Sequence, residues 1–114
     1  MTCRQGNGFV VLRPEGDLCE GPESDRVEAA LAAWVGQKRC VIVDLSRTRQ
    51  LAARGLGILV RAHQESMGHG GRIGVCGATA LHLWMLRVTC VAKFLAVYKT
   101  KAAAVAALSG RTVS

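Results

Sequence analysis

Five cysteines and three histidines are the side chains here that could bind a metal ion or take part in nucleophilic or acid–base catalysis. The cysteines are widely spaced, odd in number and lack a C-x-x-C pair, a pattern typical of neither a disulfide framework nor a zinc site. They are Cys3, Cys19, Cys40, Cys76 and Cys90. His63, His69 and His82 fall in different predicted elements, and no Ser-His-Asp or Cys-His arrangement can be placed. The sequence therefore predicts a binding protein rather than an enzyme, with no catalytic residue, no metal site and no cofactor.

A cluster of arginines is the second chemical feature, in a chain with a formal net charge of +7. Four of them lie between positions 47 and 61, namely Arg47, Arg49, Arg54 and Arg61. A basic surface accelerates encounter with nucleic acids, anionic surfaces and acidic proteins alike; the alternative is a merely solvated charged face. Because aromatic residues are few and none is interleaved with the arginines, nucleic acid is the weaker choice of partner.

The hydrophobic pattern predicts the strands that would position these residues. Residues 9–18 are rich in strand formers and are then broken by proline and glycine, which predicts an edge strand or a hairpin. The nearly unbroken run 41–45 is typical of a central strand buried on both faces, and 72–77 predicts a second buried strand. Cys40 and Cys76, beside or within these runs, are expected to be small apolar core residues.

Helical spacing of apolar residues predicts helices over 22–36, over 55–67 and, after an N-cap at Thr79, over 79–88. The glycines in 68–71 end the second helix, and 47–54 is expected to be a polar connector. A short strand over 94–98 and an alanine-rich helix over 101–108 complete the alternation, which predicts an α/β domain with a mostly parallel sheet. Trp34 and Trp84 lie on apolar helical faces and are expected in the core or in a subunit contact.

The two ends of the chain carry no recognisable targeting signal. The first eight residues lack the apolar run of a signal peptide, and no stretch reaches the roughly 18 apolar residues of a membrane helix. We therefore expect a cytoplasmic protein with a flexible segment over 1–8, one domain over 9–108 and a frayed tail over 109–114.

Short motifs along 9–108 occur in a characteristic order. Val43-Asp44-Leu45-Ser46 is followed, nine positions after the serine, by Gly55-Leu56-Gly57. Gly16-Asp17-Leu18, Gly70-Gly71-Arg72-Ile73 and the segment 94–98 flank this pair of motifs. Together they resemble the STAS domain family of anti-sigma factor antagonists, also called anti-anti-sigma factors. The resemblance implies a small mixed sheet of four to five strands with about four helices.

The resemblance also implies a function in the partner switching that controls bacterial sigma factors and hence transcription. In that scheme an unphosphorylated antagonist captures an anti-sigma factor, which is a serine kinase of the histidine-kinase ATPase type. Phosphorylation of a serine just before the Gly-Leu-Gly motif reverses the capture, because it places about two negative charges in the binding surface. The expected partner-binding residues are Arg47, Arg49, Ala52, Ala53, Arg54, Gly55, Leu56, Gly57 and Arg61.

This chain departs from the family at the phosphoacceptor itself. Ala53 stands at the position of the serine, Ala52 replaces the family's aspartate, and Arg54 replaces a second hydroxyl residue. Alanine has no oxygen to accept a phosphoryl group, so the usual switch cannot operate at this site. Arg54 at the start of a helix is expected to suit an acidic partner surface. The alternative is drift in an unneeded site, with Gly55 and Gly57 kept only for close packing.

Other interpretations stay open. The chain could be a scaffold subunit of a larger STAS assembly, a small-molecule-sensing STAS module or a self-associating protein. Ser46, Ser66 and Thr89 are hydroxyls that a different kinase could use. Cys19 and Cys90, which replace an aspartate and a glycine common in the family, could form a redox switch.

Overall fold

The computed structural model describes residues 1–6, 8–37, 40–93 and 95–108 of the chain. Its main sheet has five strands in the order β1-β2-β4-β6-β7. Their bounds are Thr2–Gly6 (β1), Phe9–Arg13 (β2), Cys40–Asp44 (β4), Arg72–Cys76 (β6) and Ala96–Tyr98 (β7). β1 is antiparallel to β2, and the other neighbouring strands are parallel. The class predicted from sequence, an α/β domain with a mixed and mostly parallel sheet, is confirmed.

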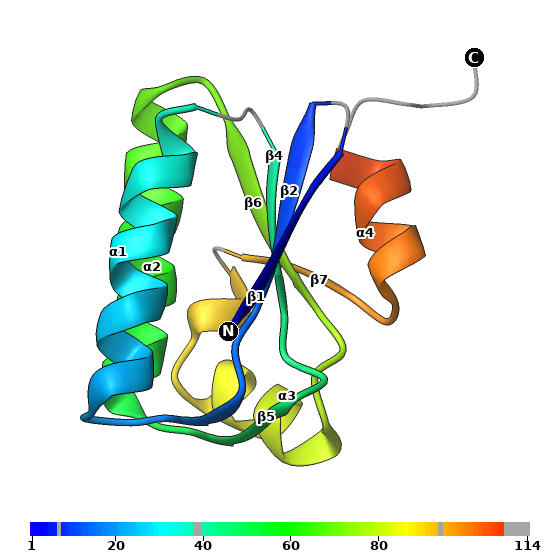
Figure 1. The fold of residues 1–114 in the computed structure, drawn as a ribbon. Coiled ribbons are helices and arrows are strands. Elements are labelled where there is room, and N and C mark those ends of the chain that lie inside the picture. Colours follow the sequence, from blue (N-terminus) through cyan, green and yellow to red (C-terminus); the bar gives the residue numbers. More distant parts are fainter. Residues whose placement is uncertain (7, 38–39, 94, 109–114) are drawn as a thin grey trace.

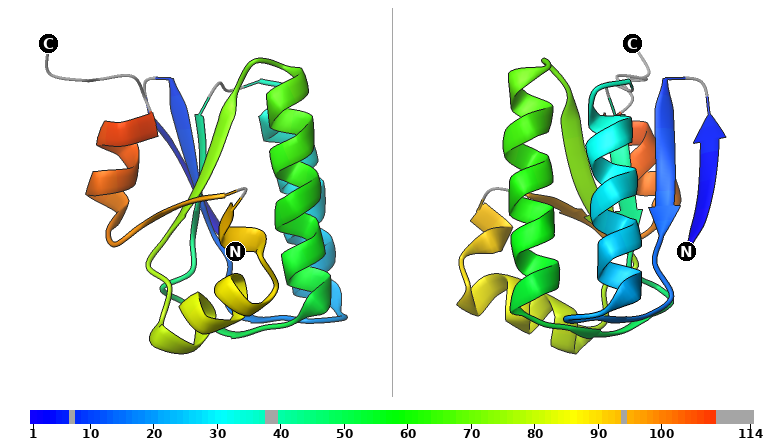
Figure 2. Two further views of the ribbon diagram at one scale, coloured as in Figure 1. Left: turned by 180° about the vertical axis from the view of Figure 1, so that it is seen from behind. Right: turned by 60° about the vertical axis from the view of Figure 1, so that its left-hand side comes forward.

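A second, two-stranded parallel sheet pairs β3, Gly16–Leu18, with β5, Thr48–Leu51. The helices are α1 (Pro22–Val35), α2 (Ala53–Gly68), α3 (Ala80–Val88) and α4 (Lys101–Leu108), with a short 3₁₀ turn over Val91–Lys93. α1 and α2 lie side by side over one face of the main sheet, and α4 covers the other face (Figures 1 and 2). α3 and β5 lie together at one end of the molecule (Figure 1).

The alternation of side chains along the strands divides the core between these two faces. In β2, Val10 and Leu12 belong to the apolar cluster formed with α1 and α2, whereas Val11 belongs to a smaller cluster with Ala104 and Leu108 of α4. β4 is buried along its whole length, as expected of the strand at the centre of the sheet. The sheet is therefore the middle layer of three, and the apolar core between the sheet and α4 is smaller than the core between the sheet and α1 and α2.

Several predicted elements are confirmed in place. Helices occur over the four predicted segments, and Thr79 caps α3 by accepting a hydrogen bond of 3.2 Å from the amide of His82. The chain leaves α2 through Gly70, which has a left-handed backbone with φ of 72°. The last strand is observed over Ala96–Tyr98; Phe94 of the predicted 94–98 strand lies outside the described residues, as does the predicted tail 109–114.

Three predictions about local structure were wrong. Residues 2–6 of the expected flexible segment form the edge strand β1, which pairs with β2 from Thr2↔Arg13 to Gly6↔Phe9. The strand predicted at the edge, β2, is consequently an interior strand, and the hairpin lies between β1 and β2 rather than within 9–18. The expected connector 47–54 contains β5, because its residues pair with β3 from a distant part of the sequence.

Candidate partner-binding site

The short sheet of β3 and β5 fixes the segment that leads into α2. The amide of Gly16 donates to the carbonyl of Arg47 at 3.0 Å, and the amide of Ala52 donates to the carbonyl of Leu18 at 3.1 Å. Leu18 and Leu51 are both buried in the main core cluster. The 47–54 segment is therefore held by backbone hydrogen bonds and by apolar anchors, directly before the first turn of α2.

The two glycines of the Gly-Leu-Gly motif have different structural roles. A Cβ atom added to Gly55 would lie 2.7 Å from the carbonyl oxygen and 2.8 Å from Cβ of Leu18, so only glycine allows α2 to start this close to β3. A Cβ atom added to Gly57 meets nothing within 4 Å. The close-packing interpretation is confirmed for Gly55 alone. Gly57 leaves a bare exposed position in the second turn of α2, at a cost of about 1 kcal/mol in helix propensity relative to alanine.

The predicted partner-binding residues fall into three groups by exposure. Arg47, Arg49, Ala53, Gly57 and Arg61 are exposed, Ala52 and Arg54 are half-buried, and Gly55 and Leu56 are buried. Leu56 belongs to the main apolar core cluster. A partner could touch the first group directly, whereas Gly55 and Leu56 shape the site from beneath.

Ala53 is the first residue of α2, and its side chain is exposed. Ala52 occupies the N-cap position with an extended backbone, and no side chain accepts a hydrogen bond from the first turn. A hydroxyl at position 53 would therefore lie on the surface at the helix start, but this chain has none there.

Arg54 is engaged by carboxylates of the same chain. Its Nη2 atom lies 2.9 Å from Oδ1 of Asp25 and 3.0 Å from Oε1 of Glu28, and its Nη1 atom lies 3.4 Å from Oε2 of Glu20. The hydrogen bond that Arg54 donates to Asp25, together with the charges of Glu28 and Glu20, raises the pKa of the guanidinium. The side chain is only 25% exposed. The expectation that Arg54 awaits an acidic partner therefore needs revision, because α1 and its preceding loop already supply those acids.

Arg61, two turns further along α2, has a looser contact with the same acidic group. Its Nη1 atom lies 3.4 Å from Oε2 of Glu28, and the side chain remains 70% exposed. Arg49 is similarly exposed and lies 3.4 Å from Asp17. Exposed ion pairs of this kind contribute little to stability. Arg47, Arg49 and Arg61 are therefore the cations of the predicted set that a partner could reach.

His82 is a residue of this end of the molecule that sequence reasoning did not place. It is buried; its Nδ1 atom accepts the amide of Thr79 at 3.1 Å, and its Nε2 atom lies 3.0 Å from the carbonyl oxygen of Arg49. These two contacts join the start of α3 to β5 within the 47–54 segment. The spacing Thr79-x-x-His82, which places a polar side chain three residues after the N-cap, is the sequence signal that could have revealed it.

α3 also carries an exposed apolar stripe, which we define as Leu81, Trp84 and Val88. These side chains follow helical spacing, and each is more than half exposed. Trp84 was expected in the core or in a subunit contact, and it is not in the core; Trp34 packs partly buried against the main cluster. Contiguous exposed apolar groups of this kind commonly mark interaction surfaces.

All five cysteines are free thiols. Cys40 and Cys76 are buried as predicted, and burial raises the pKa of both; for Cys76, burial and the charge of Asp44 raise the pKa to about 11. Cys19 donates a weak hydrogen bond to the side chain of Gln50. Cys90 has a left-handed backbone with φ of 62°, a conformation that glycine adopts more readily than other residues.

The three alternative hydroxyls differ in access. Ser46 is exposed, whereas Ser66 is fully buried and Thr89 donates to the carbonyl of Met85 at 2.6 Å. Ser66 is therefore not available to a kinase in the folded protein. The described residues contain no group of three metal-binding side chains, and no helix among them is long and apolar enough to cross a membrane.

His63 and His69, the other two histidines, lie at the far end of α2 from this site. His63 is half-buried, and His69 is exposed at the C-cap of α2. Neither histidine lies in the 47–54 segment or in the first turn of α2. The structure therefore brings no general base to the start of α2 from these positions.

Comparison with known proteins agrees with this geometry. A family model described as the STAS domain matches residues 1–104. No curated protein has a sequence that matches the chain. Among solved structures, an anti-sigma factor antagonist from Mycobacterium paratuberculosis is similar with a TM-score of 0.83 and 22% identity, over 94% of this chain and 91% of that chain.

Two further structures share the fold at lower identity. The anti-sigma factor antagonist SpoIIAA in its unphosphorylated form has a TM-score of 0.75 and 16% identity, over 96% of this chain and 97% of that chain. The STAS domain of a SulP transporter from Vibrio cholerae has a TM-score of 0.73 and 17% identity, over 93% and 85%. Because the family model spans nearly all of the sequence and the fold agrees with it, this chain belongs to the STAS domain family.

Proposed function

We propose that this chain is an anti-sigma factor antagonist-like binding module that acts in the cytoplasm and has no enzymatic activity. Its partner would be an anti-sigma factor of the serine kinase type, with a histidine-kinase ATPase fold, and capture of this partner would free a sigma factor for transcription. The surface around the first turn of α2 would make the contact. Solved structures of similar fold that are described as anti-sigma factor antagonists support this choice of partner class.

The observation that carries the proposal is Ala53, exposed at the first position of α2 and held there by Gly55 and the β3–β5 pair. The backbone at the start of α2 would present a hydroxyl at position 53 to a kinase, but alanine has no hydroxyl. Binding through this surface would then be permanent rather than switched. The apolar stripe of α3, on a helix joined to β5 through His82, would enlarge the contact beyond the loop.

Charge complementarity would come from Arg47 and Arg49 rather than from Arg54. Both side chains are exposed, whereas Arg54 already contacts three carboxylates. Replacing an exposed rim charge changes mainly the association rate of a complex. Arg49→Glu should therefore slow association with the anti-sigma factor, and unchanged association kinetics would count against this surface.

The test restores the missing hydroxyl. The purified protein, its Ala53→Ser variant and a positional control, Gly57→Ser, are incubated with lysate of the source organism with and without ATP, and captured proteins are identified. We expect an ATPase-type anti-sigma factor with all three proteins, released by ATP only from Ala53→Ser. Gly57→Ser adds an exposed serine one turn further along α2 and should not respond to ATP. Absence of such a kinase from every sample would refute the proposal.

A scaffold subunit is the second candidate, favoured by the exposed stripe of Leu81, Trp84 and Val88. Self-association through this stripe would place the chain in a larger STAS assembly. Sedimentation of the native protein and of a Trp84→Lys variant discriminates the two candidates. A stable oligomer that the variant abolishes, together with no kinase partner, supports the scaffold.

A further inference from the structure

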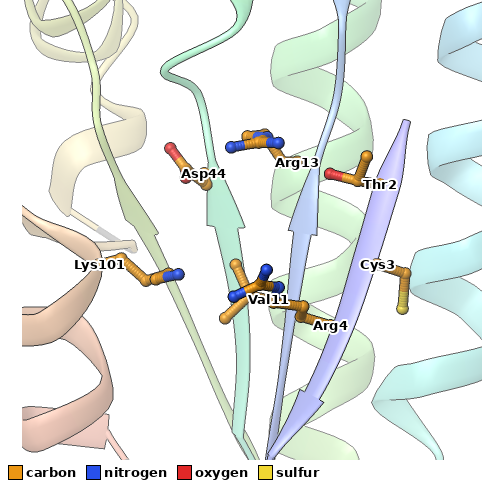
Figure 3. Close-up of a pocket in the computed structure, with 7 residues that line it drawn as sticks. All are labelled: Thr2, Cys3, Arg4, Val11, Arg13, Asp44 and Lys101. Atoms are coloured by element: carbon orange, nitrogen blue, oxygen red, sulfur yellow. The ribbon is translucent and has the colours of Figure 1, made fainter.

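A cavity of about 250 Å³ lies on the face of the sheet opposite to α1 and α2 (Figure 3). It lies where β1, β2 and β4 meet the start of α4. Three of its lining side chains are cationic and come from three different elements: Arg4 from β1, Arg13 from β2 and Lys101 from α4. Asp44, at the end of β4, is the one carboxylate in the lining.

The register of the strands explains why these residues gather. Thr2 pairs with Arg13 and Arg4 pairs with Val11, and residues directly opposite each other in neighbouring strands lie on the same face. Val11 packs against α4, so Arg4 and Arg13 lie on the α4 side as well. Asp44 follows the buried Ile42 on this face by the same alternation. Asp44 is directly opposite Cys76 of β6 in the strand register, and Cys76 belongs to the apolar cluster on this face.

The three cationic side chains have no acidic partner among the described residues. The side chains of Arg4, Arg13 and Lys101 form no salt bridge or hydrogen bond with another described residue, and the Nε atom of Arg13 is buried without a hydrogen-bond partner. Asp44 itself accepts the amide of Ser46 at 3.0 Å. Leaving a buried donor unpaired costs about 1–3 kcal/mol, and more for a charged group, so an anion that accepted a hydrogen bond from Nε of Arg13 would be stabilised there.

The distribution of charge along the whole sequence also favours an anionic ligand in this cavity. Six of the eight acidic residues lie between positions 15 and 28, and none follows Glu65 in the sequence. Lys101 is the first residue of α4, at the helix end that already carries partial positive charge. A cation at this end is unfavourable by itself, and an anion beside it would be stabilised by both the side chain and the helix.

We propose that this cavity binds a small molecule bearing a phosphate monoester. Three cations and one carboxylate leave the lining with a charge that matches the approximately two negative charges of such a group. The planar guanidinium groups of Arg4 and Arg13 suit bidentate contacts with phosphate oxygens, and Lys101 adds a point charge. The site is separate from the start of α2, so it would regulate or tether the domain independently of the partner surface.

The test is an NMR titration of the ¹⁵N-labelled full chain with inorganic phosphate and with glycerol phosphate, at an ionic strength held constant with sodium chloride. We expect saturable shifts of amides in β1, at Arg13 and at Lys101, with glycerol phosphate binding at least as tightly as phosphate. Shifts that grow without saturation, or binding of phosphate but not of the monoester, would overturn the proposal.

Three variants assign the binding to this cavity. Arg13→Gln should weaken binding by about tenfold, because it removes charge-assisted hydrogen bonds. Arg87→Gln, which removes the same charge from an exposed position at the end of α3, should leave the affinity unchanged. Asp44→Asn retains the acceptor for Ser46 but removes the repulsive charge, so it should tighten binding several-fold.

A fourth variant guards against misfolding. Lys101→Gln alters a helix end rather than a strand and should also weaken binding, so it replaces Arg13→Gln if that variant loses its dispersed spectrum. An equal loss of affinity in Arg87→Gln would show a diffuse charge effect and would refute the assigned site.

Discussion

Two groups of cations in this molecule are held in opposite ways. On the α1–α2 side, Arg54 and Arg61 lie against Glu20, Asp25 and Glu28, which α1 and its preceding loop supply. On the α4 side, Arg4, Arg13 and Lys101 surround a cavity without an ion pair among the described residues. In the first group Arg54 has its charge satisfied within the chain and Arg61 has a looser contact, whereas the second group has no such carboxylates. The difference shows that the placement of a few carboxylates, rather than the net charge of +7, decides which cations remain available to a ligand.

The largest expected effect concerns the close approach that brings α2 to β3 and Arg54 to α1. Gly55→Ala should destabilise the protein by about 2 kcal/mol, because the added Cβ atom would meet backbone and Cβ atoms of Leu18 below 3 Å. Gly57→Ala is the matched control and should stabilise by up to about 1 kcal/mol, because it adds helix propensity in open space. Urea unfolding measures both variants. Effects of the same sign would contradict the different roles assigned to the two glycines.

The second prediction tests the comparison directly. Arg54→Met should lower the urea midpoint, because Glu20, Asp25 and Glu28 would then face one another without a cation. Arg13→Met, measured in phosphate-free buffer, should leave stability unchanged or raise it, because it removes a buried unpaired donor beside other cations. If Arg13→Met destabilised the protein as much as Arg54→Met, the two groups would not differ as described.

Added salt should reduce the stability that Arg54 contributes and should reduce the destabilising repulsion among the cations that line the cavity. Raising ionic strength from about 0.1 M to about 1 M shortens the screening length from roughly 10 Å to 3 Å. We expect the destabilisation caused by Arg54→Met to shrink, because the attraction it removes is screened. The wild-type protein should gain more stability from salt than Arg13→Met does. The wild-type cavity has three cations whose mutual repulsion salt can screen, whereas the variant has two. Parallel salt curves for all three proteins would argue against this difference.

The smallest expected effect uses the free cysteines. Cys3 is exposed on the edge strand β1, whereas Cys76 is buried on the α4 side of the sheet, and burial with the charge of Asp44 raises its pKa to about 11. At pH 8 iodoacetamide should modify Cys3 and Cys90 readily and leave Cys76 unmodified, since its thiol stays protonated and covered. Mass spectrometry of the labelled peptides gives the rates, and equal rates at Cys3 and Cys76 would contradict the described burial.

The larger elements of the fold were predictable because their patterns are local. The apolar run 41–45 and the helical spacing over 22–36 report burial along a single element, and the structure has the central strand and α1 at these places. The strands β1 and β5 were missed for a physical reason. Their sequences, TCRQG and TRQL, are short and polar, and they become strands only because β2 and β3 offer backbone partners.

Some features of the candidate site could likewise be predicted from the sequence, and others could not. The absence of a hydroxyl at Ala53 and the buried nature of Cys40 and Cys76 can be stated from residue types. The need for glycine at 55 but not at 57 could not, because the pattern Gly-Leu-Gly does not say which glycine approaches Leu18. His82 was assigned no role, since its contact with the carbonyl oxygen of Arg49 depends on α3 lying beside β5.

By itself the sequence determined the class of fold, the position of most helices, and the absence of a hydroxyl at Ala53. Only the tertiary structure decided which arginines are paired with acids and which surround a cavity. An ion pair depends on side chains from elements far apart in the sequence, and Arg54 finds Asp25 and Glu28 because α2 packs beside α1. Arg4 and Arg13 lack such neighbours because the strand register places them on the face that α4 covers, where Asp44 is the one acidic residue lining the cavity.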